Sequence, residues 1–176
     1  YLNPGQSSSV LHNVVNAVCL DAAGNLRVGT GAGLSKYNPE TDNFTHYDMG
    51  GLLVDNSVNK IINKGDKLYL GTTKTGVIIY DIRTQEHQVY SHDPHNPQSI
   101  GHNHIRTLSL DKDNNLWAGT HHNGIYVLNY GDRHFISYTE KDGLTSDYIR
   151  CITQLPDGKI WVGTYNGLNF IDPQTK

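Results

Sequence analysis

The sequence has little of several features that mark common protein classes. It contains 2 cysteines and 1 methionine in 176 residues, charged residues make up only 18%, and the formal net charge is -3. No apolar run approaches the roughly 18 residues of a membrane span, and the first residues do not form a signal peptide. These absences argue against a disordered chain, and they argue against nucleic-acid binding because phosphates require a basic surface.

Glycine and tyrosine are abundant instead, with 18 and 11 copies. Such a composition favours β-structure over helices. The dipeptide Gly-Thr closes a short apolar run four times, at intervals of 42, 48 and 44 residues. A second glycine and an aliphatic residue follow each copy after a short gap. The four copies are Gly29-Thr30, Gly71-Thr72, Gly119-Thr120 and Gly163-Thr164.

Each repeat is predicted to contain four short strands separated by turns. The first strand carries two aliphatic residues three positions apart, such as Ile105 and Leu108, and the second strand ends in Gly-Thr. A third strand follows a tight turn, and the fourth has an aromatic or β-branched signature such as Phe135–Tyr138. Four antiparallel strands in about 40–45 residues are typical of one blade of a β-propeller.

The predicted fold is therefore an all-β β-propeller segment over residues 1–176, with about four blades belonging to a larger propeller. Its last blade lacks a fourth strand, and residues 1–13 are interpreted as the tail and linker of a preceding blade that ends at Tyr1. The blades are predicted at residues 14–47, 57–90, 104–138 and 148–176.

The clearest repeat, Ile149–Asp172, contains Trp-Val-Gly-Thr-Tyr-Asn-Gly-Leu after a Pro-Asp-Gly turn. This pattern resembles the two-component regulator propeller repeat, and the resemblance extends over essentially the whole chain. Arg27 and Tyr69 replace the usual tryptophan, and the second repeat has lost its Asp-x-x-Gly turn.

The resemblance implies a propeller, typically seven-bladed, in the periplasmic sensor region of a Bacteroidetes-type hybrid two-component system. It implies a non-enzymatic module that senses an oligosaccharide and signals to a histidine kinase elsewhere in the full-length protein. That full-length protein would also provide the membrane attachment, and self-association as a dimer is expected.

Two other functions remain open at this stage. The chain could be a propeller enzyme such as a polysaccharide lyase, with a histidine such as His121 as the base. It could also be a protein-interaction scaffold without a small ligand.

The turns between second and third strands supply the first candidate ligand-binding residues. Propeller ligands usually meet the rim on which these turns emerge, and aromatic or imidazole rings there can stack on sugars or donate hydrogen bonds to hydroxyl groups. The alternative is that these are ordinary solvated turn residues. The candidates are His121, His122, Tyr165 and Asn166.

A second set of candidates follows the aliphatic anchor of each first strand. First strands line the central channel of a propeller, so these polar residues could form a ring near its mouth. The two arginines would suit a carboxylate or a sulfate group. The alternative is that each residue caps the backbone of a neighbouring blade. The four residues are Asn16, Asn59, Arg106 and Arg150.

Neither a cofactor nor a metal site is predicted. The 10 histidines include several in one loop, but none has the spacing of a dedicated metal motif. Cys19 and Cys151 are expected to point to the same face of their blades, so a disulfide between them is not predicted.

Overall fold

The computed structural model describes residues 8–173. Fifteen β-strands and one short 3-10 helix, η1 (Glu140–Asp142), make up its regular secondary structure. No helix in the described part of the chain is long and apolar enough to cross a membrane. In chain order the strands are β1 (Val15–Leu20), β2 (Leu26–Thr30), β3 (Gly33–Asn38), β4 (Asn43–Tyr47), β5 (Val58–Lys64), β6 (Lys67–Thr72), β7 (Val77–Asp81), β8 (His87–Tyr90), β9 (Ile105–Leu110), β10 (Leu116–Thr120), β11 (Ile125–Leu128), β12 (Phe135–Tyr138), β13 (Ile149–Gln154), β14 (Ile160–Thr164) and β15 (Gly167–Ile171).

The strands form four antiparallel sheets in which each strand pairs with the next one along the chain. Three sheets have four strands: β1–β4, β5–β8 and β9–β12. Over the described residues the fourth sheet has three strands, β13–β15. The predicted all-β fold of four-stranded antiparallel blades is confirmed.

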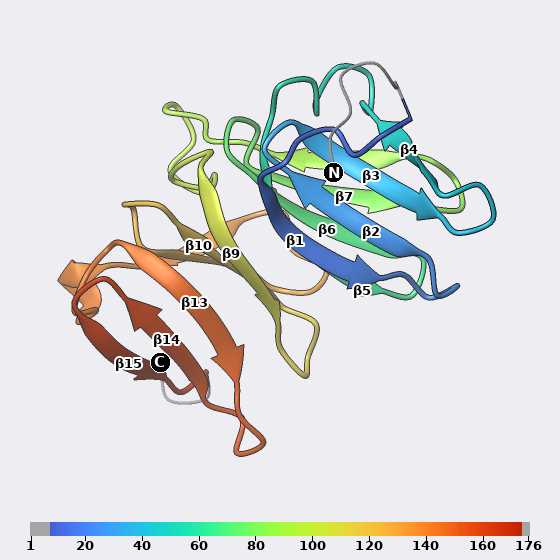
Figure 1. The fold of residues 1–176 in the computed structure, drawn as a ribbon. Helices are drawn as coiled ribbons and strands as arrows, with labels where there is room; N and C mark the ends of the chain where they lie inside the picture. The colour runs from blue at the N-terminus through green and yellow to red at the C-terminus, as the bar shows by residue number, and fades with distance from the viewer. Residues whose placement is uncertain (1–7, 174–176) are drawn as a thin grey trace. The chain divides into compact units, whose positions relative to one another are not determined.

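The chain divides into two compact units, residues 1–89 and 90–176, which we call the first and second units. The first unit contains sheet β1–β4 and most of sheet β5–β8, whose last strand ends at the boundary. The second unit contains sheets β9–β12 and β13–β15. Within each unit the two first strands are neighbours, β1 with β5 and β9 with β13 (Figure 1).

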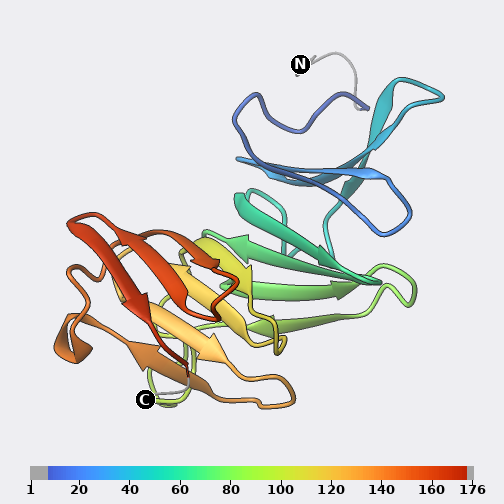
Figure 2. The ribbon, with the colours of Figure 1, turned by 90° about the horizontal axis from the view of Figure 1, so that it is seen from below.

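The two sheets of each unit lie beside one another (Figure 2), and small residues allow them to pack closely. A Cβ atom on Gly29 would lie 2.8 Å from Val58 Cγ1, and one on Gly119 would lie 2.5 Å from Ile149 Cγ2. In the second unit the buried Trp117 packs in one core cluster with Ile149. The glycine of the repeated Gly-Thr therefore lets the first strand of the next blade approach.

The threonine of each Gly-Thr organises the turn between the second and third strands. Its hydroxyl donates to a glycine carbonyl across the turn and accepts a backbone N–H from within it. In the third blade Thr120 Oγ1 donates to Gly124 O at 2.8 Å and accepts from Asn123 N at 2.8 Å. The equivalent hydroxyl-to-carbonyl bonds measure 3.1, 2.9 and 3.1 Å and join Thr30 to Gly33, Thr72 to Gly76 and Thr164 to Gly167.

Every first strand contains a β-bulge, which explains why its two aliphatic anchors are three residues apart. In a regular strand such residues would point to opposite faces, but one extra residue between them restores a common face. Ile149 pairs with Thr164 and Cys151 pairs with Gly163, so Arg150 is the extra residue. The same register shift occurs in β1, β5 and β9, where the extra residues are Asn16, Asn59 and Arg106.

The segments that lead into the first and third blades attach to them in the same way. Ser8 O accepts the backbone N–H of Phe44 at 2.8 Å, and Gln98 O accepts that of Phe135 at 2.9 Å. Val10 is buried. The predicted role of Tyr1 as the last residue of a preceding blade lies outside the described residues.

Candidate ligand-binding site

Three positions of each repeat come together at one edge of its sheet. They are the residue before the first-strand anchor, the bulge residue after that anchor, and the residue after Gly-Thr. Backbone hydrogen bonds hold the first and third positions together: His121 N donates to His104 O at 3.0 Å, and Tyr165 N donates to Tyr148 O at 2.9 Å. The bulge residue interrupts the ladder beside them. The sheet therefore fixes the backbone positions of these three residues in every blade. The side chains at these positions can differ from blade to blade.

In the second unit these positions carry aromatic and cationic side chains, which we call the rim cluster. Both blades contribute three residues, and two neighbouring histidines flank them. The cluster consists of His104, Arg106 and His121 from the third blade, Tyr148, Arg150 and Tyr165 from the fourth, and the flanking His102 and His122.

The rings of the rim cluster form a continuous series of contacts. The imidazoles of His104 and His121 stack with centroids 4.6 Å apart and planes 4° apart. His121 meets Tyr148 edge-on at 5.6 Å, and Tyr148 lies 6.2 Å from Tyr165. On the other side of His121, the ring centroids of His102 and His122 are 4.3 Å apart. These contacts join the two blades of the unit through aromatic side chains.

The two arginines of the rim cluster are exposed and lack carboxylate partners. Arg150 lies over the ring of Tyr165, with 5.3 Å between the guanidinium carbon and the ring centroid. Among residues 8–173, neither Arg106 nor Arg150 forms a salt bridge, whereas Arg27 and Arg83 do. A guanidinium group placed over a ring can still offer N–H donors to a ligand.

Partial burial and neighbouring positive charge lower the pKa of three cluster histidines. Partial burial, followed by the proximity of His122, Arg106 and Arg150, lowers the pKa of His121. Partial burial and other histidines likewise lower the pKa of His104 and of His102. The lowered pKa values favour the neutral forms of these three histidines, whereas the two arginines carry positive charge.

The equivalent positions of the first unit have a different chemistry. Asn16 Nδ2 donates to Ser57 Oγ at 2.9 Å, and that hydroxyl donates to Asn59 Oδ1 at 2.9 Å. Asn59 Nδ2 then donates to Thr73 Oγ1 at 3.0 Å. These neutral side chains partner one another, unlike the arginines of the second unit.

The structure brings six of the eight predicted residues into the second unit and two into the first. Asn16 and Asn59 belong to the hydrogen-bonded chain of the first unit. Asn166 is exposed in the turn after β14, and its backbone N–H donates to Thr164 Oγ1 at 3.2 Å. Whether any of the eight binds a ligand stays a prediction.

Sequence reasoning missed three members of the rim cluster as ligand-binding residues: His102, His104 and Tyr148. His104 and Tyr148 immediately precede the first-strand anchors Ile105 and Ile149, so their signal was available in the repeat alignment. His102 has no equivalent signal because it lies in the loop before β9, outside the repeated strands.

The described residues contain no group of three or more His, Cys, Asp and Glu side chains arranged to hold a metal ion. Cys19 and Cys151 are both free thiols. Burial raises the pKa of Cys19, so this thiol is not activated as a nucleophile.

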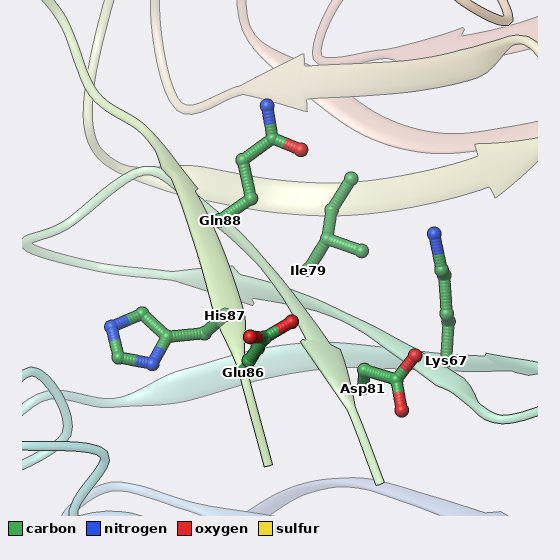
Figure 3. A pocket seen from close by; sticks show the side chains of 6 residues that line it. All are labelled: Lys67, Ile79, Asp81, Glu86, His87 and Gln88. Carbon is green, nitrogen blue, oxygen red and sulfur yellow. The ribbon is translucent and has the colours of Figure 1, made fainter. Parts of the chain in front are cut away.

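Three hollows lie away from the rim cluster. One in the first unit, of about 190 Å³, is lined by Lys67 and Asp81 together with Ile79, Glu86, His87 and Gln88 (Figure 3). In Figure 3 the His87 side chain points away from the others, as strand alternation requires. Two smaller hollows in the second unit involve the turn at Asp157 and the ring of Trp117. None of the three is lined by a predicted site residue.

Comparison with known proteins finds a family model that matches parts of the third and fourth repeats. Residues 99–122 and 143–166 match the model of the two-component regulator propeller. These two segments are similar to two-component regulator propeller repeats. The matched segments include Arg106, His121 and His122 in the first repeat and Tyr148 to Tyr165 in the second.

The chain spans only a small part of the length of the three similar proteins that follow. Histidine kinase P4 of Formosa agariphila is 25% identical over 181 residues, which cover 96% of this chain and 13% of the kinase. The extracellular domain of the putative hybrid two component system BT3049 from B. thetaiotaomicron has a TM-score of 0.85 and 23% identity, covering 99% of this chain and 25% of that domain. The extracellular domain of BT4673 from the same organism has a TM-score of 0.74 and 23% identity, with 94% and 22% coverage.

Proposed function

We propose that this chain is part of the periplasmic sensor region of a hybrid two-component system. In this role its propeller blades bind an oligosaccharide and pass the signal to a histidine kinase elsewhere in the full-length protein. The match to regulator propeller repeats and the similarity to a histidine kinase support the sensor role. The chain itself contributes binding and no catalysis.

The rim cluster is the observation that carries the binding role. Tyr165 is 72% exposed, and Tyr148 is 47% exposed. Exposed aromatic faces can cover the apolar face of a sugar ring, while guanidinium and imidazole N–H groups can bind hydroxyl oxygens. Because three members from each blade start from a sheet edge held by backbone hydrogen bonds, little ordering is required when a ligand binds.

One feature favours a polysaccharide lyase as the second candidate function. The lowered pKa of His121 favours its neutral form, and a neutral imidazole can accept a proton from a sugar carbon. Its Nδ1 atom lies 3.3 Å from Nδ1 of His122, so one of the two rings can orient the other. A lyase would also need a stabiliser for the developing anion, which Arg106 or Arg150 could provide.

Calorimetry and product analysis on one panel of plant, algal and host oligosaccharides separate these functions. The sensor role predicts saturable heat with at least one glycan and no change of that glycan after prolonged incubation. Formation of unsaturated, ultraviolet-absorbing products that disappears in His121→Ala would establish the lyase instead. Absence of both heat and products across the panel would overturn the sensor proposal and favour a protein-interaction scaffold.

A further inference from the structure

The charge of the rim cluster carries a more specific inference about its ligand. Two guanidinium groups, Arg106 and Arg150, act on the same imidazole, that of His121. Both arginines are bulge residues at the same position of the neighbouring strands β9 and β13, so they start from one edge of the unit. Ring contacts from Tyr165 through Tyr148 to His121 connect the two blades at this edge.

Among residues 90–173 of the second unit, no carboxylate forms a salt bridge with either arginine. Asp147, next to Tyr148 in the chain, accepts the backbone N–H of Glu140 at 2.8 Å. Glu140 in turn accepts the backbone N–H of Asp147 at 3.0 Å. Both acidic side chains thus brace the loop before β13, and the charged groups that act on His121 are all basic.

The first unit shows that the repeat does not require positive charge at the bulge. Asn16 and Asn59 occupy the same backbone position and satisfy their amides within the unit. If Arg106 and Arg150 only stabilised the fold, they would be expected to form hydrogen bonds within their unit in the same way. In the second unit both stay exposed, beside aromatic rings that can position a sugar.

We propose that the rim cluster binds an anionic oligosaccharide, with Arg106 and Arg150 holding its carboxylate or sulfate group and Tyr165 stacking on a sugar ring. Planar oxyanions of this kind accept paired N–H bonds from guanidinium groups. Arg150 covers one face of Tyr165, and the exposure of that ring leaves area for the sugar. This inference rests on the proposed function and specifies its ligand class.

Calorimetric titration of the 176-residue chain with two matched pairs of probes tests the ligand class. The first pair is tetragalacturonate and its fully methyl-esterified form, and the second is a sulfated galactan tetrasaccharide and its desulfated form. We expect at least one acidic probe to bind more than about tenfold more tightly than its neutral partner. Which pair shows this difference distinguishes a carboxylate from a sulfate, and added salt should weaken the binding.

The double variant Arg106→Gln, Arg150→Gln tests the site. Both side chains are exposed, so the variant should fold with an unchanged melting temperature, and it should lose most of the preference for the acidic probe. Arg133→Gln is the matched control, because Arg133 is an exposed arginine in the turn between β11 and β12.

Three results would overturn the proposal: equal affinity within both pairs, no binding by either acidic probe, or an acidic preference that survives in the double variant. If a neutral oligosaccharide of the wider panel binds while both acidic probes fail, the anionic ligand is wrong and the sensor function stands.

Discussion

Trp117 and Arg27 occupy the same position of the repeat and use the same partner. Trp117 Nε1 donates to Asp111 Oδ2 at 2.9 Å, and Arg27 Nη2 donates to Asp21 Oδ2 at 2.7 Å. An aromatic residue of the fourth strand also contacts each of these two side chains. The guanidinium carbon of Arg27 lies 5.2 Å from the ring centroid of Tyr47. Arginine replaces the usual tryptophan here because the long guanidinium side chain reaches the same carboxylate.

The fourth blade lacks this carboxylate, which leads to a stability prediction. Leu155 makes the same turn hydrogen bonds with its backbone as Asp111 does in the third blade, so the two residues are equivalent. The indole N–H of Trp161 is buried and has no hydrogen-bond partner in the described residues. Leu155→Asp should supply the acceptor and raise the free energy of unfolding by about 1 kcal/mol. Urea unfolding measures this gain. Leu155→Ala is the control without a carboxylate, and an aspartate variant no more stable than the alanine variant would refute the explanation.

Acid should destabilise the second unit through the rim-cluster histidines. The pKa values of His102, His104 and His121 are lowered from 6.5 in the folded chain, so the unfolded chain binds protons first as the pH falls. Stability is therefore fully present above about pH 7 and declines as the pH falls from the unfolded pKa toward the lowered ones. Melting temperatures between pH 8 and pH 5 measure this decline.

The matched variants for this pH experiment are His121→Gln and His134→Gln. His121→Gln removes one shifted group and should flatten the decline, whereas His134 lies exposed in the turn before β12 and its variant should follow the unmodified chain. Identical pH profiles for all three proteins would show that the cluster does not control the acid sensitivity.

The first strands show how far the sequence could predict this structure. Four strands per blade and the approximate blade positions follow from the Gly-Thr copies, because a repeated motif marks the same structural position each time. The anchor spacing of three, as in Ile105 and Leu108, already implies an irregular strand, but only the pairing register shows that Arg106 is the bulge residue. Ring contacts such as that between Tyr148 and His122 depend on tertiary packing, which the sequence pattern does not describe.

Close packing between neighbouring first and second strands predicts a steric limit at Gly119. A Cβ atom there would lie 2.5 Å from Ile149 Cγ2 and 2.7 Å from Thr107 Cγ2. Gly119→Ala should therefore lower the free energy of unfolding by about 1–3 kcal/mol through overpacking. Chemical denaturation checks this value. Gly65→Asn is the control, since a side chain at Gly65 meets open space and its φ of +56° lies in the left-handed region that asparagine tolerates. Equal stability of the two variants would contradict close strand packing.

The molecule exposes apolar faces that the packing within its units leaves uncovered. Val18 on β1 is 61% exposed, and Phe170 on β15 is 57% exposed. In the interior of each unit, by contrast, first strands such as β5 and β13 bury their anchors against the preceding blade. The faces on β1 and β15 therefore have the character of unfilled blade interfaces.

These faces predict that the 176-residue chain self-associates. Light scattering over a range of concentrations should show a mass that rises above that of the monomer, because pairing of copies buries the apolar strands. Val18→Lys should reduce the association, while Val89→Lys, on β8, serves as the control. A monomer that is unaffected by concentration would rule out this association.

The most direct measurement of the central claim compares two tyrosines in calorimetric titrations with the oligosaccharide that binds the unmodified chain. Tyr165 and Tyr130 are similarly exposed, at 72% and 76%, but only Tyr165 belongs to the rim cluster. The account predicts that Tyr165→Ala weakens binding more than about tenfold and that Tyr130→Ala leaves it unchanged. Undiminished binding by Tyr165→Ala would contradict it and place the ligand elsewhere.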